Sequence, residues 1–206
     1  MPVKEILVCL SAYSLGCLAT GYYLVRWRCG IDIRNVGSRT TGAFNVGRVL
    51  KMPGFILTLA GDVLKGVLAM ALARTFEFEK LPLMFVMAAV VLGHNFPIQL
   101  GFRGGNGLAT GTGALLVFDT SLVVALVILL CISLPVLAIL KAVFKLPIRY
   151  YTPSKITVAA MPLLAAALGR EWWFVLGLAV LVGIILWTIR RNMRHLAEED
   201  QSQPIV

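Results

Sequence analysis

The chain has 206 residues, of which 59% are hydrophobic and only 14% are charged, and its mean hydropathy is +0.86. This composition excludes a soluble globular protein and predicts an integral membrane protein. The net charge of +9 does not indicate a nucleic-acid partner, because the basic residues are spread over short loops between apolar segments. Contact with anionic membrane lipids or with an anionic substrate accounts for it better.

Seven apolar segments are predicted to cross the membrane as helices. The first continues without a clean cleavage site, so we interpret it as a retained span and not as a signal peptide. The long apolar stretch after residue 111 is divided at the polar residues 119–121. The expected spans are 3–25, 53–73, 81–100, 111–118, 122–144, 156–168 and 172–189. We therefore expect an all-α bundle of seven transmembrane helices that forms a single domain over residues 1–206.

The distribution of basic residues predicts the orientation of this bundle. The segments 26–51, 101–107 and 141–155 and the tail from residue 190 contain 14 of the 19 Lys and Arg residues. Positive loops stay in the cytoplasm, so the N-terminus is expected outside and the C-terminus inside. The cytoplasmic parts are then the loops at about 26–51, 101–107 and 145–155 and the tail 190–206.

A glycine-rich segment follows the third apolar segment. It begins with Leu92-Gly93-His94-Asn95-Phe96-Pro97 and continues, four residues later, as Phe102-Arg103-Gly104-Gly105-Asn106-Gly107-Leu108-Ala109-Thr110-Gly111. Glycines allow backbone N–H groups to surround an anion, and these lead into an apolar helix whose N-terminus is partly positive. The pattern predicts an anion-binding loop formed by Arg103, Gly104, Gly105, Asn106, Gly107 and Thr110. The alternative is that the glycines form a membrane turn or close helix contacts.

His94 lies at the expected cytoplasmic end of an apolar helix. There it is a candidate general base or phosphate donor. The alternative is structural, because the following Phe96 and Pro97 suggest that His94 fixes the backbone where the helix ends.

The loop after the first apolar segment is rich in hydrogen-bond donors. It combines glycines, hydroxyls, an asparagine and arginines, and the candidate binding residues are Gly37, Ser38, Arg39, Gly42, Asn45 and Arg48. Such residues bind oxyanions, with arginine able to form paired, charge-assisted hydrogen bonds. The loop lacks the Gly-Lys-Ser/Thr of a nucleotide P-loop. The alternative is an ordinary basic loop whose arginines contact lipid headgroups.

The second apolar segment carries Asp62 and Lys65, three residues apart on one helix face. Charges at this depth are costly, so they should pair and face the bundle interior or a polar cavity. A purely structural ion pair and a role in positioning a substrate phosphate are equally compatible with the pattern.

Other chemistries find no support in the sequence. It contains no Ser/His/Asp order of a covalent triad, no HExxH and no Cys/His set, so we expect neither a metal nor a cofactor. The four cysteines show no paired spacing, and no disulfide framework is predicted.

Taken together, these segments resemble the bacterial, membrane-integral glycerol-3-phosphate acyltransferases of the PlsY type, which use acyl phosphate as donor. The matching positions follow the family order and are Gly37-Ser38, Gly42-Ala43, Asn45-Val46, Arg48, Asp62, Lys65, Gly66, Gly93 to Pro97, Phe102, Gly104, Gly105, Gly107, Ala109, Thr110, Arg190 and Asn192. The seven-helix architecture of that family agrees with the number of predicted spans.

The resemblance implies transfer of a fatty acyl group from acyl phosphate to the 1-hydroxyl of glycerol 3-phosphate, giving lysophosphatidic acid. It implies a location in the bacterial inner membrane with the site facing the cytoplasm. Ser38, Arg48 and His94 are then the candidate catalytic residues. The candidate substrate-binding residues are Gly37, Arg39, Gly42, Asn45, Asp62, Lys65, Arg103, Gly104, Gly105, Asn106, Gly107, Thr110 and Asn192.

This chain departs from the family pattern at five positions. It has Arg39 and Thr40 in place of glycine and asparagine, Phe44 in place of threonine, Asn106 in place of lysine and Ile189 in place of histidine. Two expected phosphate partners are therefore missing. Two alternatives follow: a divergent paralogue that acylates another acceptor, or a non-catalytic protein that binds or transports an anionic lipid.

Overall fold

The computed structural model describes residues 2–144 and 152–200, and these contain helices and no strand. The α-helices are α1 Val3–Gly16, α2 Thr20–Cys29, α3 Ala43–Arg74, α4 Lys80–Asn95, α5 Leu108–Phe118, α6 Thr120–Phe144, α7 Thr152–Ala167 and α8 Trp172–Asp200. Two short 3-10 helices are η1 Ile33–Asn35 and η2 Ile98–Leu100. The chain forms two compact units, Met1–Phe118 with Trp187–Val206, and Asp119–Leu186. The prediction of an all-helical protein is confirmed for these residues.

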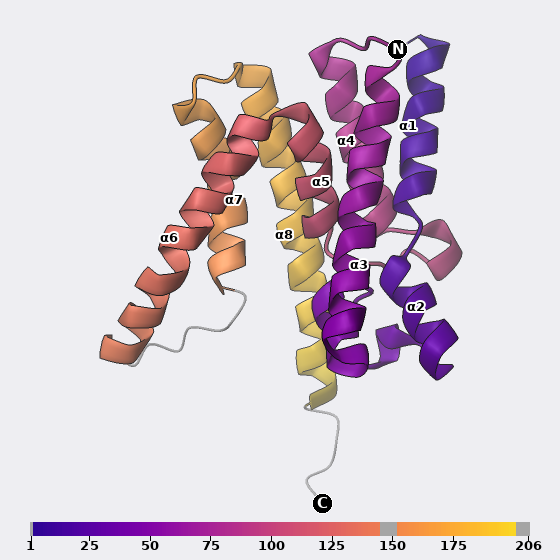
Figure 1. Ribbon diagram of the computed structural model, residues 1–206, viewed down its shortest axis with the longest axis vertical. Coiled ribbons are helices and arrows are strands. Elements are labelled where there is room, and N and C mark those ends of the chain that lie inside the picture. The colour runs from indigo at the N-terminus through magenta and orange to yellow at the C-terminus, as the bar shows by residue number, and fades with distance from the viewer. Residues whose placement is uncertain (1, 145–151, 201–206) are drawn as a thin grey trace, which may run out of the picture. The chain divides into compact units, whose positions relative to one another are not determined.

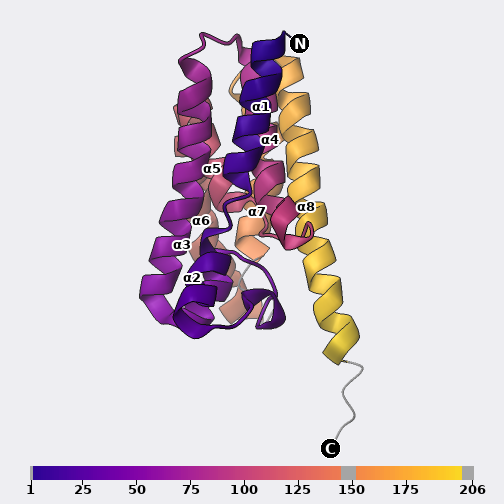
Figure 2. The ribbon, with the colours of Figure 1, turned by 90° about the vertical axis from the view of Figure 1, so that its right-hand side faces the viewer.

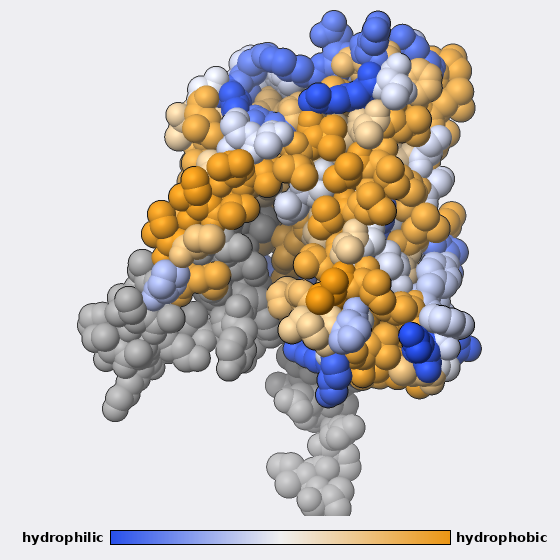
Figure 3. Space-filling view, viewed as in Figure 1, coloured by the Kyte–Doolittle hydropathy of each residue, from blue (hydrophilic) through white to orange (hydrophobic). Residues whose placement is uncertain are grey.

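The apolar character of the helices supports a multi-pass membrane protein. Within the described residues four helical segments are long and apolar enough to cross a membrane: Val3–Cys29, Ala43–Arg74, Lys80–Leu100 and Trp172–Asn192. Shorter apolar helices cover Leu108–Phe118 and Thr120–Pro135. On the face of the first unit seen in Figure 3, hydrophobic residues cover most of the middle of the helices and hydrophilic residues gather at both ends.

In the first unit α1 packs against α4, and α3 packs against α4 and α5 (Figures 1 and 2). Glycines permit these close crossings. A Cβ atom at Gly93 would overlap the carbonyl oxygen of Tyr13 on α1, and one at Gly113 would overlap that of Val63 on α3. Small residues at such crossings let helix backbones approach in a membrane protein.

The predicted span 3–25 lies within one of these apolar segments, Val3–Cys29, but its helix is interrupted. Helix α1 ends at Gly16 and α2 begins at Thr20. The break leaves backbone carbonyls without helical partners, and polar side chains of other segments satisfy two of them: Gln99 donates to the Cys17 oxygen and Lys65 to the Leu18 oxygen. Because an unpaired carbonyl is costly in an apolar environment, these side chains stabilise the break.

The predicted loop 26–51 is also partly wrong, since α2 continues to Cys29 and α3 begins at Ala43. Helix α3 changes direction at Lys51, whose φ of 57° and ψ of −157° are not helical. The Phe44 and Phe55 rings are only 5.2 Å apart, whereas eleven residues of straight helix would span about 16 Å. The segment before Lys51 therefore folds back along the one after it.

Three further boundaries differ from the sequence prediction. Helix α4 ends at Asn95 and not at residue 100, because the chain turns through η2. Helix α8 continues to Asp200, so the first part of the predicted tail is helical. The predicted division at Asp119 is confirmed, although α6 begins at Thr120, where the Asp119 carboxylate accepts from the backbone N–H of Leu122. Of the predicted loop 145–155, residues 145–151 lie outside the described residues.

Candidate active site

The first loop is organised by the side chain of Asn45, which is fully buried on the first turn of α3. Its amide nitrogen lies 3.1, 2.9 and 2.9 Å from the carbonyl oxygens of Ile33, Val36 and Thr40, and its amide oxygen accepts from the Ser38 N–H at 2.8 Å. All of these bonds are within the protein. Asn45 therefore shapes the loop, and this differs from its predicted direct contact with substrate.

Ser38 and Arg48 both lie close to Gly37 in this loop. Gly37 adopts a φ of +58°, and a Cβ atom there would lie 3.1 Å from Nη1 of Arg48, so the guanidinium lies over the glycine. Ser38 shares a 3.3 Å hydrogen bond with the Thr40 hydroxyl. Arg48 is exposed and Ser38 is half-buried. A half-buried hydroxyl and an exposed guanidinium thus both lie near Gly37.

The remaining predicted residues of the first loop are Arg39 and Gly42, on either side of Thr40 and Thr41. Arg39 has a positive φ of 57°, a conformation that residues with side chains rarely adopt. Gly42 is the N-cap residue of α3. Phe44 follows the cap and is 80% exposed.

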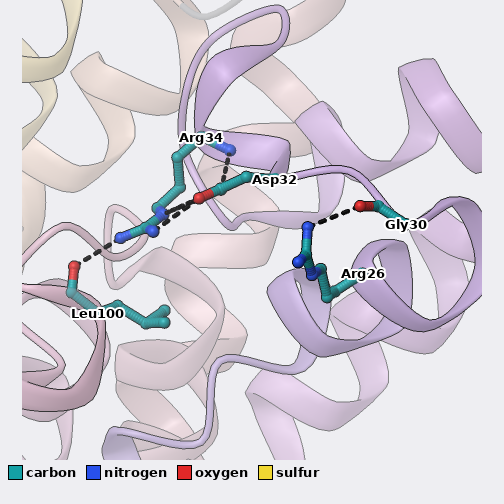
Figure 4. Close-up of polar contacts among 5 residues, drawn as sticks. All are labelled: Arg26, Gly30, Asp32, Arg34 and Leu100. Atoms are coloured by element: carbon teal, nitrogen blue, oxygen red, sulfur yellow. Dashed lines mark hydrogen bonds and ion pairs between the residues drawn. The ribbon is translucent and has the colours of Figure 1, made fainter.

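An ion pair that the sequence analysis did not single out links the first loop to the segment after α4. The Arg34 guanidinium lies 2.7 Å from the Asp32 carboxylate and donates to the Leu100 carbonyl oxygen at 2.6 Å (Figure 4). In the same view Arg26 donates to the Gly30 carbonyl at the end of α2. The hydrogen bond from Arg34 holds the pKa of Asp32 below its usual value. Arg34 therefore places both predicted loops at one end of the first unit.

Four polar side chains from three helices meet in the interior of this unit. Lys65 Nζ lies 2.9 Å from Asp62 Oδ1 on α3, and His94 Nδ1 of α4 lies 3.6 Å from the same oxygen. The Thr110 hydroxyl of α5 lies 3.2 Å from His94 Nδ1. Asp62 and Lys65 are only 2% and 3% exposed. This confirms that the two charges pair and face the bundle interior.

The glycine loop folds back over the end of α4. The N–H groups of Gly104 and Gly105 donate to the carbonyl oxygens of Asn95 and His94, both at 3.1 Å. The prediction that these two N–H groups surround an anion is therefore wrong, because the helix end uses them. The alternative of close packing describes them better: a Cβ atom at Gly105 would overlap the His94 imidazole.

The rest of the glycine loop approaches α8. Asn192 donates from its amide nitrogen to the amide oxygen of Asn106 at 2.9 Å, which brings together two predicted site residues that are 86 positions apart. Gly107 adopts a φ of +81° beside the Asn95 amide. Arg103 is exposed.

Sequence reasoning overlooked the residues that hold this loop in place. Asn95 is fully buried and its amide lies 3.4 Å from the Thr188 hydroxyl. Arg191 lies near the rings of Phe96 and Trp187. The helical spacing of residues 188, 191 and 192 could have shown that they share one face, but not what that face contacts.

Comparison with known proteins places this arrangement in a family. A family model described as glycerol-3-phosphate acyltransferase matches residues 6–199. Glycerol-3-phosphate acyltransferase 1 of Desulfitobacterium hafniense (strain Y51) is 40% identical over 201 residues, which cover 97% of this chain and 94% of the relative. Glycerol-3-phosphate acyltransferase of Alkaliphilus metalliredigens (strain QYMF) is 35% identical over 193 residues, covering 93% and 92%.

Two solved structures share the fold. They are crystal structures of PlsY (YgiH), an integral membrane glycerol 3-phosphate acyltransferase, in its glycerol 3-phosphate and lysophosphatidic acid forms. Their TM-scores are 0.78 and 0.76 at 27% and 26% identity, and each comparison covers 95% of this chain and 93% of PlsY. The chain described here therefore belongs to the glycerol-3-phosphate acyltransferase family.

Proposed function

We propose that this membrane acyltransferase transfers a fatty acyl group from acyl phosphate to the 1-hydroxyl of glycerol 3-phosphate, giving lysophosphatidic acid and inorganic phosphate. The acceptor is supported by the names of the curated relatives and by the glycerol 3-phosphate form of PlsY. The acyl phosphate donor is implied by the resemblance to the PlsY-type acyltransferases, and the chemistry of the first loop is compatible with it.

The observation that supports this donor is that the Arg48 guanidinium lies over Gly37, the residue before Ser38. An acyl phosphate is already activated, so the enzyme has to bind an anion and orient a hydroxyl, and it needs no nucleophile of its own. The exposed Arg48 guanidinium supplies charge-assisted hydrogen bonds to a phosphate. The Ser38 hydroxyl supplies a neutral donor next to it.

In the proposed reaction the 1-oxygen of glycerol 3-phosphate bonds to the acyl carbon. The bond from that carbon to the bridging phosphate oxygen breaks, and the departing phosphate takes the hydroxyl proton. Ser38 and Arg48 orient the donor, with Gly37, Arg39 and Gly42 shaping their loop. Arg103, Asn106, Gly107 and Asn192 are assigned to the second phosphate.

The buried cluster is assigned a positioning role. His94 is only 5% exposed, and its ring lies between Asp62 and Thr110 on one side and Gly105 on the other. We assign Asp62, Lys65 and Thr110 to holding His94, and His94 to supporting the glycine loop through Gly105. This interpretation corresponds to the structural alternative for the histidine.

We also propose seven transmembrane spans in the bacterial inner membrane, with the N-terminus outside and both loops facing the cytoplasm. The basic loops support this orientation through the positive-inside rule. The contact of Arg34 with Leu100 and that of Asn106 with Asn192 support a single site at one membrane face.

The test uses the purified chain with radiolabelled glycerol 3-phosphate and, in separate reactions, acyl phosphate, acyl-coenzyme A or acylated acyl carrier protein as donor. We expect labelled lysophosphatidic acid with acyl phosphate alone, and one inorganic phosphate released for each product molecule. Product formed only from a thioester donor would refute the donor assignment. Acyl phosphate consumed without labelled product would indicate a different acceptor.

A further inference from the structure

One face of α8 contacts the end of α4 and the segment that joins α4 to α5. The face is formed by two pairs of residues, Trp187 with Arg191 and Thr188 with Asn192. The members of each pair are four residues apart, about one helical turn, so all four share this face. They contact, in turn, Phe96, Asn95, Phe102 and Asn106. In Figure 2 the loop after α4 lies beside the middle part of α8. All of these residues belong to the first unit.

Arg191 makes the central contacts of this face. Its guanidinium carbon lies 5.2 Å from the centre of the Phe96 ring and 5.4 Å from the centre of the Trp187 ring. Its Nη2 donates to the Phe102 carbonyl oxygen at 3.4 Å. Arg191 thus contacts the segment on both sides of η2. A planar guanidinium combines ring stacking with a directed hydrogen bond, which a lysine ammonium does less well.

The carbonyl that Arg191 binds belongs to a strained residue. Phe102 has a φ of +60°, in the left-handed region that is unfavourable for residues with side chains. Such a conformation persists only where surrounding contacts impose it. The hydrogen bonds from the Phe102 N–H to Pro97 and from Arg191 to the Phe102 carbonyl are two such contacts.

The position of Phe102 determines where the glycine loop lies. Two residues later, Gly104 and Gly105 donate to the end of α4, and Gly105 lies against the His94 ring. Asn106 then receives the hydrogen bond from Asn192. The loop is therefore held by α4 on its inner side and by α8 at Phe102 and Asn106.

We propose that Arg191 is a positioning residue for acyl transfer: by holding Phe96 and Phe102 it sets the glycine loop against His94 and Asn192. This inference rests on the proposed function, because it assigns the loop to a substrate phosphate. Arg191 acts through the loop and does not itself contact the substrate. It lies between Arg190 and Asn192, the two positions that carry the resemblance in this region.

The experiment compares Arg191→Ala and Arg191→Lys with the wild-type enzyme. Arg28→Ala is the matched control, since Arg28 also lies over a tryptophan ring, Trp27, at 5.0 Å, but on α2. We expect kcat/KM to fall by about 10- to 100-fold in Arg191→Ala, because small misplacements of binding groups are costly. Arg191→Lys should recover part of the loss, and Arg28→Ala should match the wild type.

A second readout, amide hydrogen exchange followed by peptide mass spectrometry, does not depend on activity. We expect faster exchange over residues 101–107 in Arg191→Ala and unchanged exchange over residues 30–42. Wild-type exchange over 101–107, or a uniform increase throughout the first unit, would overturn the proposal. Wild-type kcat/KM in an active Arg191→Ala enzyme would also overturn it. If the wild-type chain forms no lysophosphatidic acid, the proposed function fails and the exchange result alone decides the role of Arg191.

Discussion

The imidazole of His94 occupies the space in which a side chain at Gly105 would lie. The two residues are also joined through the backbone, since the Gly105 N–H donates to the His94 carbonyl at 3.1 Å. Glycine is needed here for close approach, because an added methyl group would displace either the buried ring or the loop.

The substitution Gly105→Ala should therefore abolish most activity. We expect kcat/KM to fall by about 100-fold, the scale associated with a displacement of about 1 Å in an active site. Gly111→Ala is the matched control, because a Cβ atom there meets its nearest neighbour, Val91, at an ordinary 3.6 Å. The measurement is lysophosphatidic acid formation by both purified variants. Similar activity in the two would contradict the packing argument.

Removing one charge of the buried pair should destabilise the protein more than removing both. In Asp62→Asn or Lys65→Met the remaining charge is left in an apolar interior, at a cost of about 3–5 kcal/mol. The double variant Asp62→Asn/Lys65→Met should recover part of this loss. Thermal unfolding in detergent gives the comparison. A double variant no more stable than the single variants would mean that the pair is not the relevant contact.

Ser38→Ala and Arg48→Ala should each reduce kcat by at least about 100-fold, the loss typical for one group that stabilises a transition state. Arg48 is exposed and Ser38 is only half-buried, so the thermal midpoint should change little in either variant. Ser14→Ala provides a control, because the Ser14 hydroxyl only donates to its own helix at the Leu10 carbonyl. Full activity of both variants would contradict the catalytic roles assigned to Ser38 and Arg48.

The Asp32–Arg34 ion pair should make stability depend on pH in the acid range. Since Arg34 lowers the pKa of folded Asp32, the stabilisation is fully present above the pKa of an unfolded aspartate, about 4, and is lost as the pH falls further. Asp32→Asn should unfold at a lower temperature than the wild type at pH 7, and the difference should shrink below pH 4. A constant difference between pH 3 and pH 7 would exclude this origin.

The proposed orientation can be tested with a native cysteine. Cys29 is exposed at the end of α2 on the loop side, whereas Cys17 is buried. A membrane-impermeant maleimide should label Cys29 in inverted membrane vesicles and not in right-side-out spheroplasts. Cys29→Ser identifies the label that belongs to this residue. Labelling in spheroplasts alone would reverse the proposed orientation.

The sequence by itself determined the chemistry of the individual segments. Hydropathy determined that the protein is helical and lies in the membrane, and the cost of an isolated charge in such a protein required Asp62 and Lys65 to pair. The division at Asp119 was also readable, because a short polar run interrupts an apolar stretch. These features depend on composition or on residues a few positions apart.

Only the tertiary structure decided how the segments combine. The break after Gly16 is stabilised by contacts from distant parts of the chain, such as that of Lys65 with the Leu18 carbonyl, which no local pattern reveals. Likewise, Asn45 points inward and the Gly105 N–H is used by α4, although both residue types are equally able to bind an anion. Whether a polar group is available to a substrate or is already hydrogen-bonded within the protein depends on which distant residues lie next to it in the folded chain.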